Sequence, residues 1–156
     1  MDSSLISLDI ETTGLDSQKD AFLEIAAVRF KGSRLEGEYR TFVNPGRPVP
    51  PFITQLTGIT DQMVRTAPSI REVIPDLNAF VGNLPIVGHN VQFDLSFLRR
   101  YKILELNDAI DTYEMAAVLL PRASRYNLGS LGQQLEIPLP ATHRALDDAR
   151  VTKEVF

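Results

Sequence analysis

The segment LISLDIETTGL, residues 5–15, contains the first predicted strand and the first pair of acidic residues. Its apolar run predicts a short buried strand over residues 5–9, followed by polar side chains. Because alternate side chains of a strand share one face, Asp9 and Glu11 project the same way. Two unpaired carboxylates on a buried strand repel one another and are costly to desolvate, and a divalent cation removes that cost. The alternative is a strand end that reaches solvent, where acidic residues need no ligand.

The end of this stretch, Thr12-Thr13-Gly14-Leu15, is a candidate binding loop. Small residues and a glycine allow a ligand to approach the backbone closely. Taken alone, the same residues fit a simple turn from strand to loop.

The remaining elements follow from apolar periodicity and turn residues. Residues 22–30 and 35–43 are predicted strands, and the turn at 31–34 joins them into a hairpin. Four prolines make residues 44–51 an extended loop. Further along the chain we predict a helix from the S-x-x-E capping box at Ser69 to about Val81, a strand at 86–88, a helix at 93–104, a strand at 109–111, and helices through Leu120, over 127–135 and over 144–156.

This order of elements predicts an α/β fold with one mixed five-stranded sheet. Three antiparallel strands come first and a βαβα half follows, with helices on the faces of the sheet. A chain of 156 residues fits one domain with a substantial core. The helix over 144–156 carries no stop signal, so we expect residues 1–156 to be a single domain with its last helix cut from a longer protein.

Composition and charge restrict the possible partners. Hydrophobic residues make up 44% and charged residues 23%, as in ordinary globular proteins, and no apolar run approaches the roughly 20 residues of a membrane helix. Cysteine is absent, which excludes disulfides and thiolate zinc sites and fits a reducing, cytoplasmic location. The net charge of −4 is opposite to that of a protein with a large electrostatic grip on nucleic acid. Any such contact should be local, with metal ions offsetting acidic charge.

A second group of polar residues, Asn90-Val91-Gln92-Phe93-Asp94, follows the predicted strand at 86–88. Asp94 falls in the first turn of a helix. It is therefore either a functional carboxylate or a residue that interacts favourably with the helix dipole. Asn90 also fits a simple N-cap.

A third group spans His143 to Asp148, with His143 just before the last helix and Asp148 inside it. The two side chains border one pocket if His143 lies on the preceding loop. Asp147 and Asp148 cannot share a helix face, because neighbours are about 100° apart. Helical geometry does not decide which of the two faces the pocket, and a lone histidine here also fits a surface residue.

Taken together, the ordered series D-x-E, N-x-x-F-D and H-x-x-x-x-D resembles the motifs of the DEDDh (DnaQ-like) 3′→5′ exonucleases. The family includes the proofreading epsilon subunit of DNA polymerase III and the N-terminal exonuclease domains of DinG-type helicases. The matching segments are residues 9–15, 88–94 and 143–148. The resemblance implies a ribonuclease H-like sheet and selects Asp148 over Asp147. The sister branch has a tyrosine where this chain has Arg144, a candidate phosphate contact.

The resemblance also implies a mechanism. Asp9, Glu11, Asp94 and Asp148 would hold two divalent cations, Mg²⁺ or Mn²⁺, about 4 Å apart. His143 would take a proton from the attacking water. The reaction would release nucleoside 5′-monophosphates from the 3′ end of DNA, most readily single-stranded. The alternatives are an RNA exonuclease of the oligoribonuclease or ribonuclease T type and a non-catalytic nucleic-acid-binding module.

By the same resemblance, Thr12, Thr13, Gly14 and Leu15 would hold the terminal nucleotide. Leu15 would wedge against a base and Phe93 would pack beside the sugar, although both side chains also fit the core. Asn90 would border the substrate while chiefly fixing its loop. The implied partners are a polymerase or a fused helicase. The chain itself lacks the G-x-x-x-x-G-K-[ST] phosphate loop of a helicase.

Overall fold

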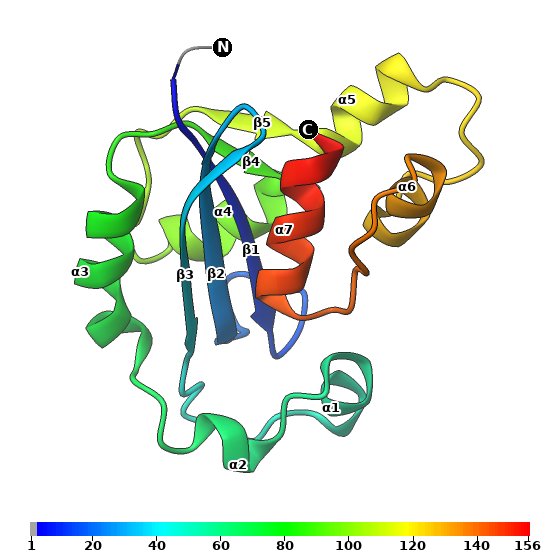
Figure 1. The fold of residues 1–156 in the computed structure, drawn as a ribbon. Helices are drawn as coiled ribbons and strands as arrows, with labels where there is room; N and C mark the ends of the chain where they lie inside the picture. Colours follow the sequence, from blue (N-terminus) through cyan, green and yellow to red (C-terminus); the bar gives the residue numbers. More distant parts are fainter. Residues whose placement is uncertain (1–2) are drawn as a thin grey trace.

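The computed structural model describes residues 3–156, and this part of the chain forms one five-stranded mixed sheet (Figure 1). The strand order is β3-β2-β1-β4-β5. Neighbours among the first three strands pair antiparallel, whereas β4 and β5 run parallel to β1. The strands are β1 (Leu5–Thr12), β2 (Phe22–Lys31), β3 (Arg34–Phe42), β4 (Ile86–Gly88) and β5 (Ala109–Asp111). The predicted α/β fold, with three antiparallel strands before a parallel half, is confirmed.

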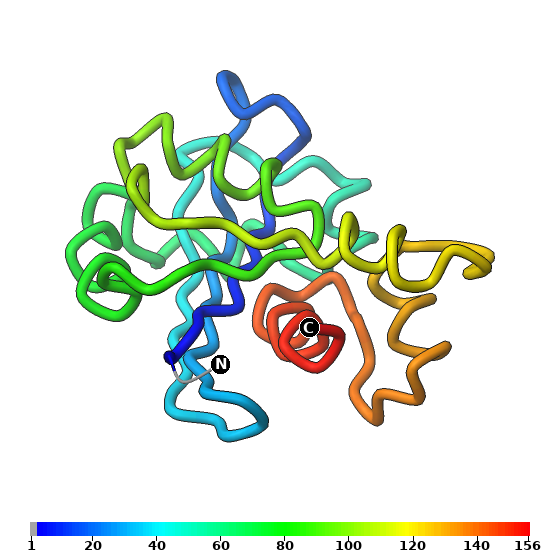
Figure 2. Tube along the Cα trace, turned by 90° about the horizontal axis from the view of Figure 1, so that it is seen from above, coloured from blue at the N-terminus to red at the C-terminus, as the bar shows by residue number. Residues whose placement is uncertain are grey.

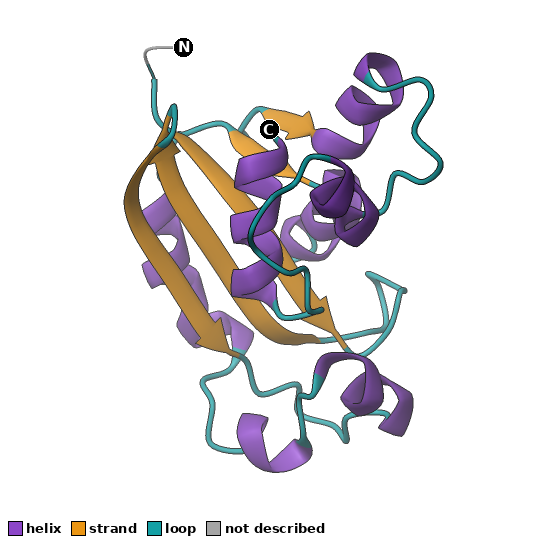
Figure 3. Cartoon of the chain, turned by 45° about the vertical axis from the view of Figure 1, so that its right-hand side comes forward, coloured by secondary structure: helices purple, strands orange, loops and turns teal. Residues whose placement is uncertain are grey.

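The two faces of β1 have different partners, because successive side chains alternate between them. Ile6, Leu8 and Ile10 are buried in the main core cluster with side chains of α3 (Ile70–Val81) and α4 (Val91–Arg99). The opposite face of β1 packs against α7 (Ala145–Val155), where the Ser7 hydroxyl donates to the carbonyl of Ala149 at 2.7 Å. Figure 3 shows α7 lying across one face of the sheet, with α3 and α4 behind the sheet.

The remaining helices surround this layered centre. Viewed end-on, α7 lies between the β2–β3 hairpin and α6 (Figure 2). None of the helices in residues 3–156 is long and apolar enough to span a bilayer. The surrounding helices are α1 (Pro51–Thr57), α2 (Asp61–Val64), α5 (Thr112–Leu119) and α6 (Leu128–Gln134).

The sequence prediction differs from the structure at two places. The loop predicted over residues 44–51 is confirmed up to Pro50, but the two helices that follow it, α1 and α2, were not predicted. Pro51 occupies a first-turn position of α1, where its missing N–H costs nothing. The helix predicted over residues 93–104 begins at Val91 and ends at Arg99. Lys102 adopts a left-handed φ of 58°, which ends the helix, although the apolar spacing continues into the buried turn.

The start of α4 is fixed by a side chain from the neighbouring strand. The Asp111 carboxylate, at the end of β5, accepts hydrogen bonds from the backbone N–H groups of Asn90 at 2.9 Å and Val91 at 3.1 Å. It also caps α5 by accepting from the Tyr113 N–H at 2.8 Å. One carboxylate therefore satisfies the exposed donors of two helix starts and sets the position of the turn that carries Asp94.

We expect Asp111→Ala to lower the free energy of unfolding by about 2 kcal/mol, because it removes a helix cap and leaves backbone donors unpaired. Urea denaturation followed by circular dichroism measures the change. The exposed Asp108, three residues earlier, provides the control, and Asp108→Ala should leave the midpoint unchanged. Equal midpoints for the two variants would show that Asp111 does not hold these helix starts.

Candidate active site

Three of the predicted carboxylates form one cluster at the end of β1. Asp9, Glu11 and Asp148 each offer an oxygen, and the three oxygens lie within 4.8 Å of one another. Strand alternation supplies the first two, and α7 supplies the third because it packs against the same face of β1. The backbone N–H of Thr142 donates to Asp148 Oδ1 at 2.9 Å and fixes that side chain.

The fourth predicted carboxylate, Asp94, approaches from the other face of the sheet. Its Oδ1 accepts the backbone N–H of Ile10 at 3.0 Å, between the two acidic residues of β1. The Asp94 residue is only 3% exposed. The oxygens of Asp94 fall outside the cluster of three. The hydrogen bond to Ile10 nevertheless holds this fourth carboxylate at the end of β1.

Burial makes this group of carboxylates hard to ionise. Burial and then the charges of Asp94 and Glu11 raise the pKa of Asp9 well above its ordinary value. Burial, followed by the charge of Asp148, raises the pKa of Glu11 to about 8. Burial likewise raises the pKa of Asp94 to about 8. Like charges held close together in a low-dielectric site favour either protonation or a bound cation.

Asp9 supplies a direct test of whether a cation fits. Its Oδ2 is buried and, within residues 3–156, has no hydrogen-bond partner. A buried carboxylate oxygen without a partner costs free energy, which ligation of a metal ion would remove. Hard divalent cations prefer clustered carboxylate oxygens of this kind. The residues present therefore fit a divalent cation.

His143 lies in the turn before α7, exposed to solvent, with a left-handed φ of 57°. Burial raises the pKa of Asp148, while the Thr142 N–H and the charge of His143 partly oppose that rise. The charge of the imidazole therefore acts on the ionisation of Asp148. His143 lies on the loop before α7 and not on the helix itself. This was the condition set from the sequence for His143 and Asp148 to border one pocket.

The loop at Thr12 to Leu15 adjoins the cluster, and its glycine has an explanation that the sequence did not reveal. A β-carbon on Gly14 would lie 2.5 Å from the Asp20 carboxylate, which also accepts from the Thr13 hydroxyl at 3.2 Å. The Asp20 side chain, and not a ligand, occupies the space that the glycine leaves free. Thr12 is buried, and its hydroxyl donates to the Gly14 carbonyl at 2.6 Å. Leu15 is 86% exposed, which excludes the core as its location.

The other two predicted substrate residues lie at the start of α4. Asn90 is exposed, has a φ of 61°, and makes no side-chain cap hydrogen bond. Asn90 therefore occupies the N-cap position, as one alternative predicted, but its side chain does not cap the helix. Phe93 is half-buried and packs against Phe97, with ring centroids 5.1 Å apart. Phe93 thus contributes to the core while keeping part of its ring accessible.

Sequence reasoning missed Glu24, although its signal was present as a single acidic residue inside the apolar strand at 22–30. Glu24 is fully buried and lies directly opposite Glu11 in the β1–β2 pairing. Its carboxylate accepts from Arg144 at 2.9 Å, from Arg40 at 3.2 Å and from the backbone N–H of Ala145 at 2.7 Å. Among the acidic side chains near the cluster in residues 3–156, Glu24 is the one that accepts from two arginines and a backbone N–H.

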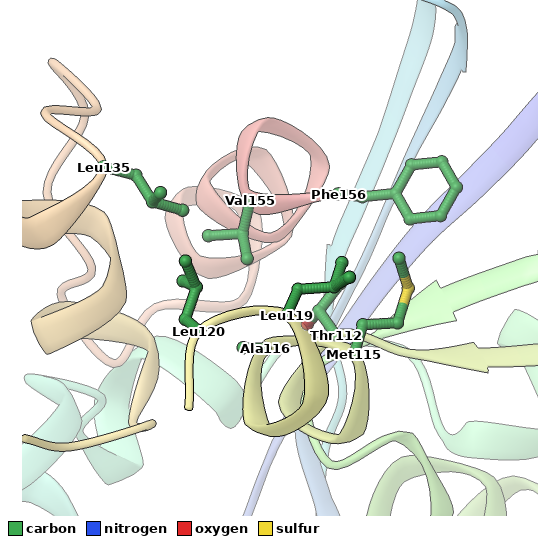
Figure 4. A pocket seen from close by; sticks show the side chains of 8 residues that line it. All are labelled: Thr112, Met115, Ala116, Leu119, Leu120, Leu135, Val155 and Phe156. Carbon is green, nitrogen blue, oxygen red and sulfur yellow. The ribbon is translucent and has the colours of Figure 1, made fainter. Parts of the chain in front are cut away.

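An apolar hollow of about 170 Å³ lies at the C-terminal end of α7, away from the acidic cluster (Figure 4). Side chains of α5, the end of α6 and the last residues of the chain surround it. None of them is ionisable, so the hollow offers no acid–base or metal chemistry. Its lining residues are Thr112, Met115, Ala116, Leu119, Leu120, Leu135, Val155 and Phe156. The acidic end of β1 is therefore the candidate active site.

A mixed sheet of this topology with acidic residues at the end of its first strand defines a ribonuclease H-like nuclease domain. A family model described as "Exonuclease" (RNase_T) matches residues 6–156. The chain therefore belongs to this exonuclease family, which depends on divalent metal ions. The resemblance to DnaQ-like exonucleases is confirmed.

Similar proteins include the PolC-type DNA polymerase III of Caldanaerobacter subterraneus subsp. tengcongensis, at 39% identity over 160 residues, and that of Thermotoga maritima, at 41% over 160 residues. These matches cover 100% and 99% of this chain but only 11% and 12% of the relatives. Among solved structures, exonuclease X in complex with 5′-overhanging duplex DNA is 29% identical, with a TM-score of 0.78 over 97% of this chain and 87% of that one. An exonuclease I structure at 20% identity shares the fold, with a TM-score of 0.82 over 97% of this chain and 39% of that one.

The raised pKa values predict how pH affects the metal-free protein. The folded state binds these protons more tightly than the unfolded state, so stability is present at low pH and is lost as pH rises toward about 8. We expect the thermal midpoint to fall between about pH 6.5 and pH 8.5, with a smaller fall in Asp9→Asn. Measuring above about pH 6.5 avoids the titration of His89, whose pKa burial lowers.

The same measurement with saturating Mn²⁺ should raise the midpoint most at the alkaline end, because cation binding needs ionised carboxylates. Asp108→Asn, at an exposed position, controls for the loss of one negative charge. A midpoint that does not respond to Mn²⁺ at pH 8.5 would contradict the assignment of a cation site.

Proposed function

We propose that this domain is a 3′→5′ exonuclease that hydrolyses the terminal phosphodiester bond of DNA, preferably single-stranded, and releases nucleoside 5′-monophosphates. One observation carries the proposal: a buried, unpartnered Asp9 oxygen lies in a cluster of three carboxylates within an exonuclease-family fold. DNA as the substrate is supported by the DNA complex of exonuclease X and by the PolC-type DNA polymerase III relatives. The same relatives support a role for residues 1–156 as one domain beside or within a replicative polymerase.

Asp9, Glu11, Asp94 and Asp148 are the residues that would hold two cations, Mg²⁺ or Mn²⁺. When bound, such ions stabilise the attacking and leaving oxygens of an in-line displacement. The protein supplies rigid placement, since two of the ligands lie on the central strand and the Ile10 N–H fixes the Asp94 carboxylate.

His143 is the general base in this proposal. Its imidazole lies on an exposed turn beside Asp148, where it can accept a proton from the attacking water and release it to solvent. A left-handed φ of 57° places His143 in the turn before α7, five residues ahead of Asp148, which supports this role.

The loop from Thr12 to Leu15 would hold the terminal nucleotide. Leu15 is 86% exposed beside the cluster, which supports a role as a wedge against a base. Across the site, the exposed Asn90 and the accessible part of the Phe93 ring would border the sugar.

Matched DNA and RNA oligomers, labelled at the 5′ or the 3′ end, test the proposal directly. With Mg²⁺ or Mn²⁺, we expect 5′-labelled DNA to shorten one nucleotide at a time and 3′-labelled DNA to release labelled mononucleotide at once. RNA should be degraded more slowly. Preferential RNA degradation would reassign the substrate. Binding of the oligomers with no release of mononucleotide would indicate a non-catalytic module.

Two neighbouring acidic residues offer a matched pair for testing the ligand set. Asp148→Asn should abolish activity, because Asp148 belongs to the acidic cluster. Asp147→Asn should retain most of the activity, because Asp147 instead accepts from the Thr142 hydroxyl at 2.7 Å and lies near Arg150. Initial rates on single-stranded DNA distinguish them, and an active Asp148→Asn enzyme would remove Asp148 from the site.

His143→Ala should lower kcat by roughly 10²- to 10⁴-fold, the usual contribution of a general base, while leaving Mn²⁺ binding intact. Rate measurements on single-stranded DNA, paired with calorimetric titration of Mn²⁺, separate these two effects. An unchanged kcat would exclude His143 as the base.

A further inference from the structure

We propose that Glu24 is a positioning residue of this active site: its buried carboxylate holds the turn at 142–145 in the conformation that presents His143 to the acidic cluster. The inference rests on the proposed role of His143 and assigns a second residue to the same step. Glu24 lies on β2, on the face of the sheet covered by α7, and has no exposed surface.

The charge of Glu24 is balanced by arginines. Glu24 and Glu11 are direct cross-strand partners, so their side chains lie on the same face, where like charges are destabilising. Arginines pair directly with Glu24: Arg144 and Arg40 both contact its carboxylate, at 2.9 and 3.2 Å. Glu24 is therefore fixed and neutralised by the protein, while Glu11 remains with the acidic cluster.

Glu24 also binds the segment that follows His143. Glu24 Oε1 accepts the Ala145 N–H at 2.7 Å and the Arg144 Nε–H at 3.2 Å, and Arg144 Nη2 donates to Oε2 at 2.9 Å. A single carboxylate thus binds the two residues that follow His143. On the other side, the Thr142 N–H donates to Asp148 Oδ1. His143 is held between two anchored neighbours.

The backbone at His143 needs such anchors. A φ of 57° is in the left-handed region, which residues other than glycine adopt uncommonly, so contacts on both sides of His143 help to hold it there. The charge-assisted, forked contact between Arg144 and Glu24 provides geometric specificity as well as attraction. Without it, the turn is free to relax and carry the imidazole away from the cluster.

Arg144 is better explained by this role than by the phosphate contact predicted from the sequence. Its guanidinium group is paired with Glu24 and lies over the Phe42 ring, 5.3 Å from the centroid. The small hollow around it also contains Asp147, and Arg150 beside it is paired with Glu38. The acidic side chains in and around the hollow offset the arginines, so the hollow has no strong attraction for an anion.

The test is Glu24→Gln, which keeps the volume and one acceptor oxygen but removes the charge that holds the arginines. We expect kcat on single-stranded DNA to fall by on the order of 10- to 100-fold, as for small misplacements of a catalytic group. KM for DNA should stay at its wild-type value and Mn²⁺ should still stabilise the variant, since the cluster of carboxylates is intact. A wild-type kcat would overturn the proposal.

Glu38→Gln is the matched control. Glu38 forms a similar forked ion pair with Arg150 of α7, at 2.6 and 2.7 Å, yet does not contact the turn at 142–145. Its loss should change the thermal midpoint slightly and leave kcat unaltered. An equal loss of kcat in both variants would show that Glu24 acts only through the general docking of α7.

A double-mutant cycle with His143→Ala separates this inference from the proposed function. If Glu24 acts through His143, adding Glu24→Gln to His143→Ala should cost little further activity. Full, additive loss in the double variant would overturn the positioning role while leaving His143 as the base. If His143→Ala alone had no effect, the failure would lie in the proposed function.

Should Glu24→Gln fail to fold, Glu24→Asp takes its place. This variant keeps the buried charge, retracts it from Ala145, and carries the same expectations.

Discussion

The carboxylates at the end of β1 repel one another, and the packing of the whole domain holds them in place. The fold buries Asp9 without a partner for one of its oxygens and brings Glu11 and Asp148 beside it. Such an arrangement is unfavourable in isolation, and it persists because the surrounding core enforces it. Packing of α3 and α4 on one face of β1 and α7 on the other leaves the strand no freedom to turn these side chains into solvent.

The contrast between Glu11 and Glu24 shows how the domain separates function from structure within one pair of residues. Both glutamates lie on the same face at the same register of the β1–β2 ladder. Two arginines and a backbone N–H saturate Glu24, whereas Glu11 joins the cluster with a pKa raised to about 8. The carboxylate of Glu24, which is fully hydrogen-bonded, fixes the segments around it. The carboxylate of Glu11 lies in the acidic cluster and is available to a cation. Polar groups that are buried and fully bonded rigidify a fold in this way.

Features set by local sequence were predictable. Strand alternation placed Asp9 and Glu11 together, the capping box at Ser69 gave the start of α3, and the order of elements gave the mixed sheet. Features that depend on distant partners were not. The end of α4 depends on a turn whose apolar residues are buried without being helical, and the reason for Gly14 is the carboxylate of Asp20. The role of Glu24 depends on contacts 120 residues away in the chain, which no spacing rule in the sequence reveals.

We propose that the carboxylates at the end of β1, including the unpartnered Oδ2 of Asp9, are cation ligands. Anomalous diffraction from crystals soaked in Mn²⁺ with a nucleoside 5′-monophosphate tests this proposal. We expect anomalous peaks within coordination distance of Asp9, Glu11 and Asp148, with Asp94 contributing from α4 and the phosphate of the nucleotide completing the site. A well-ordered crystal with the nucleotide bound, but with no manganese beside Asp9, would contradict it.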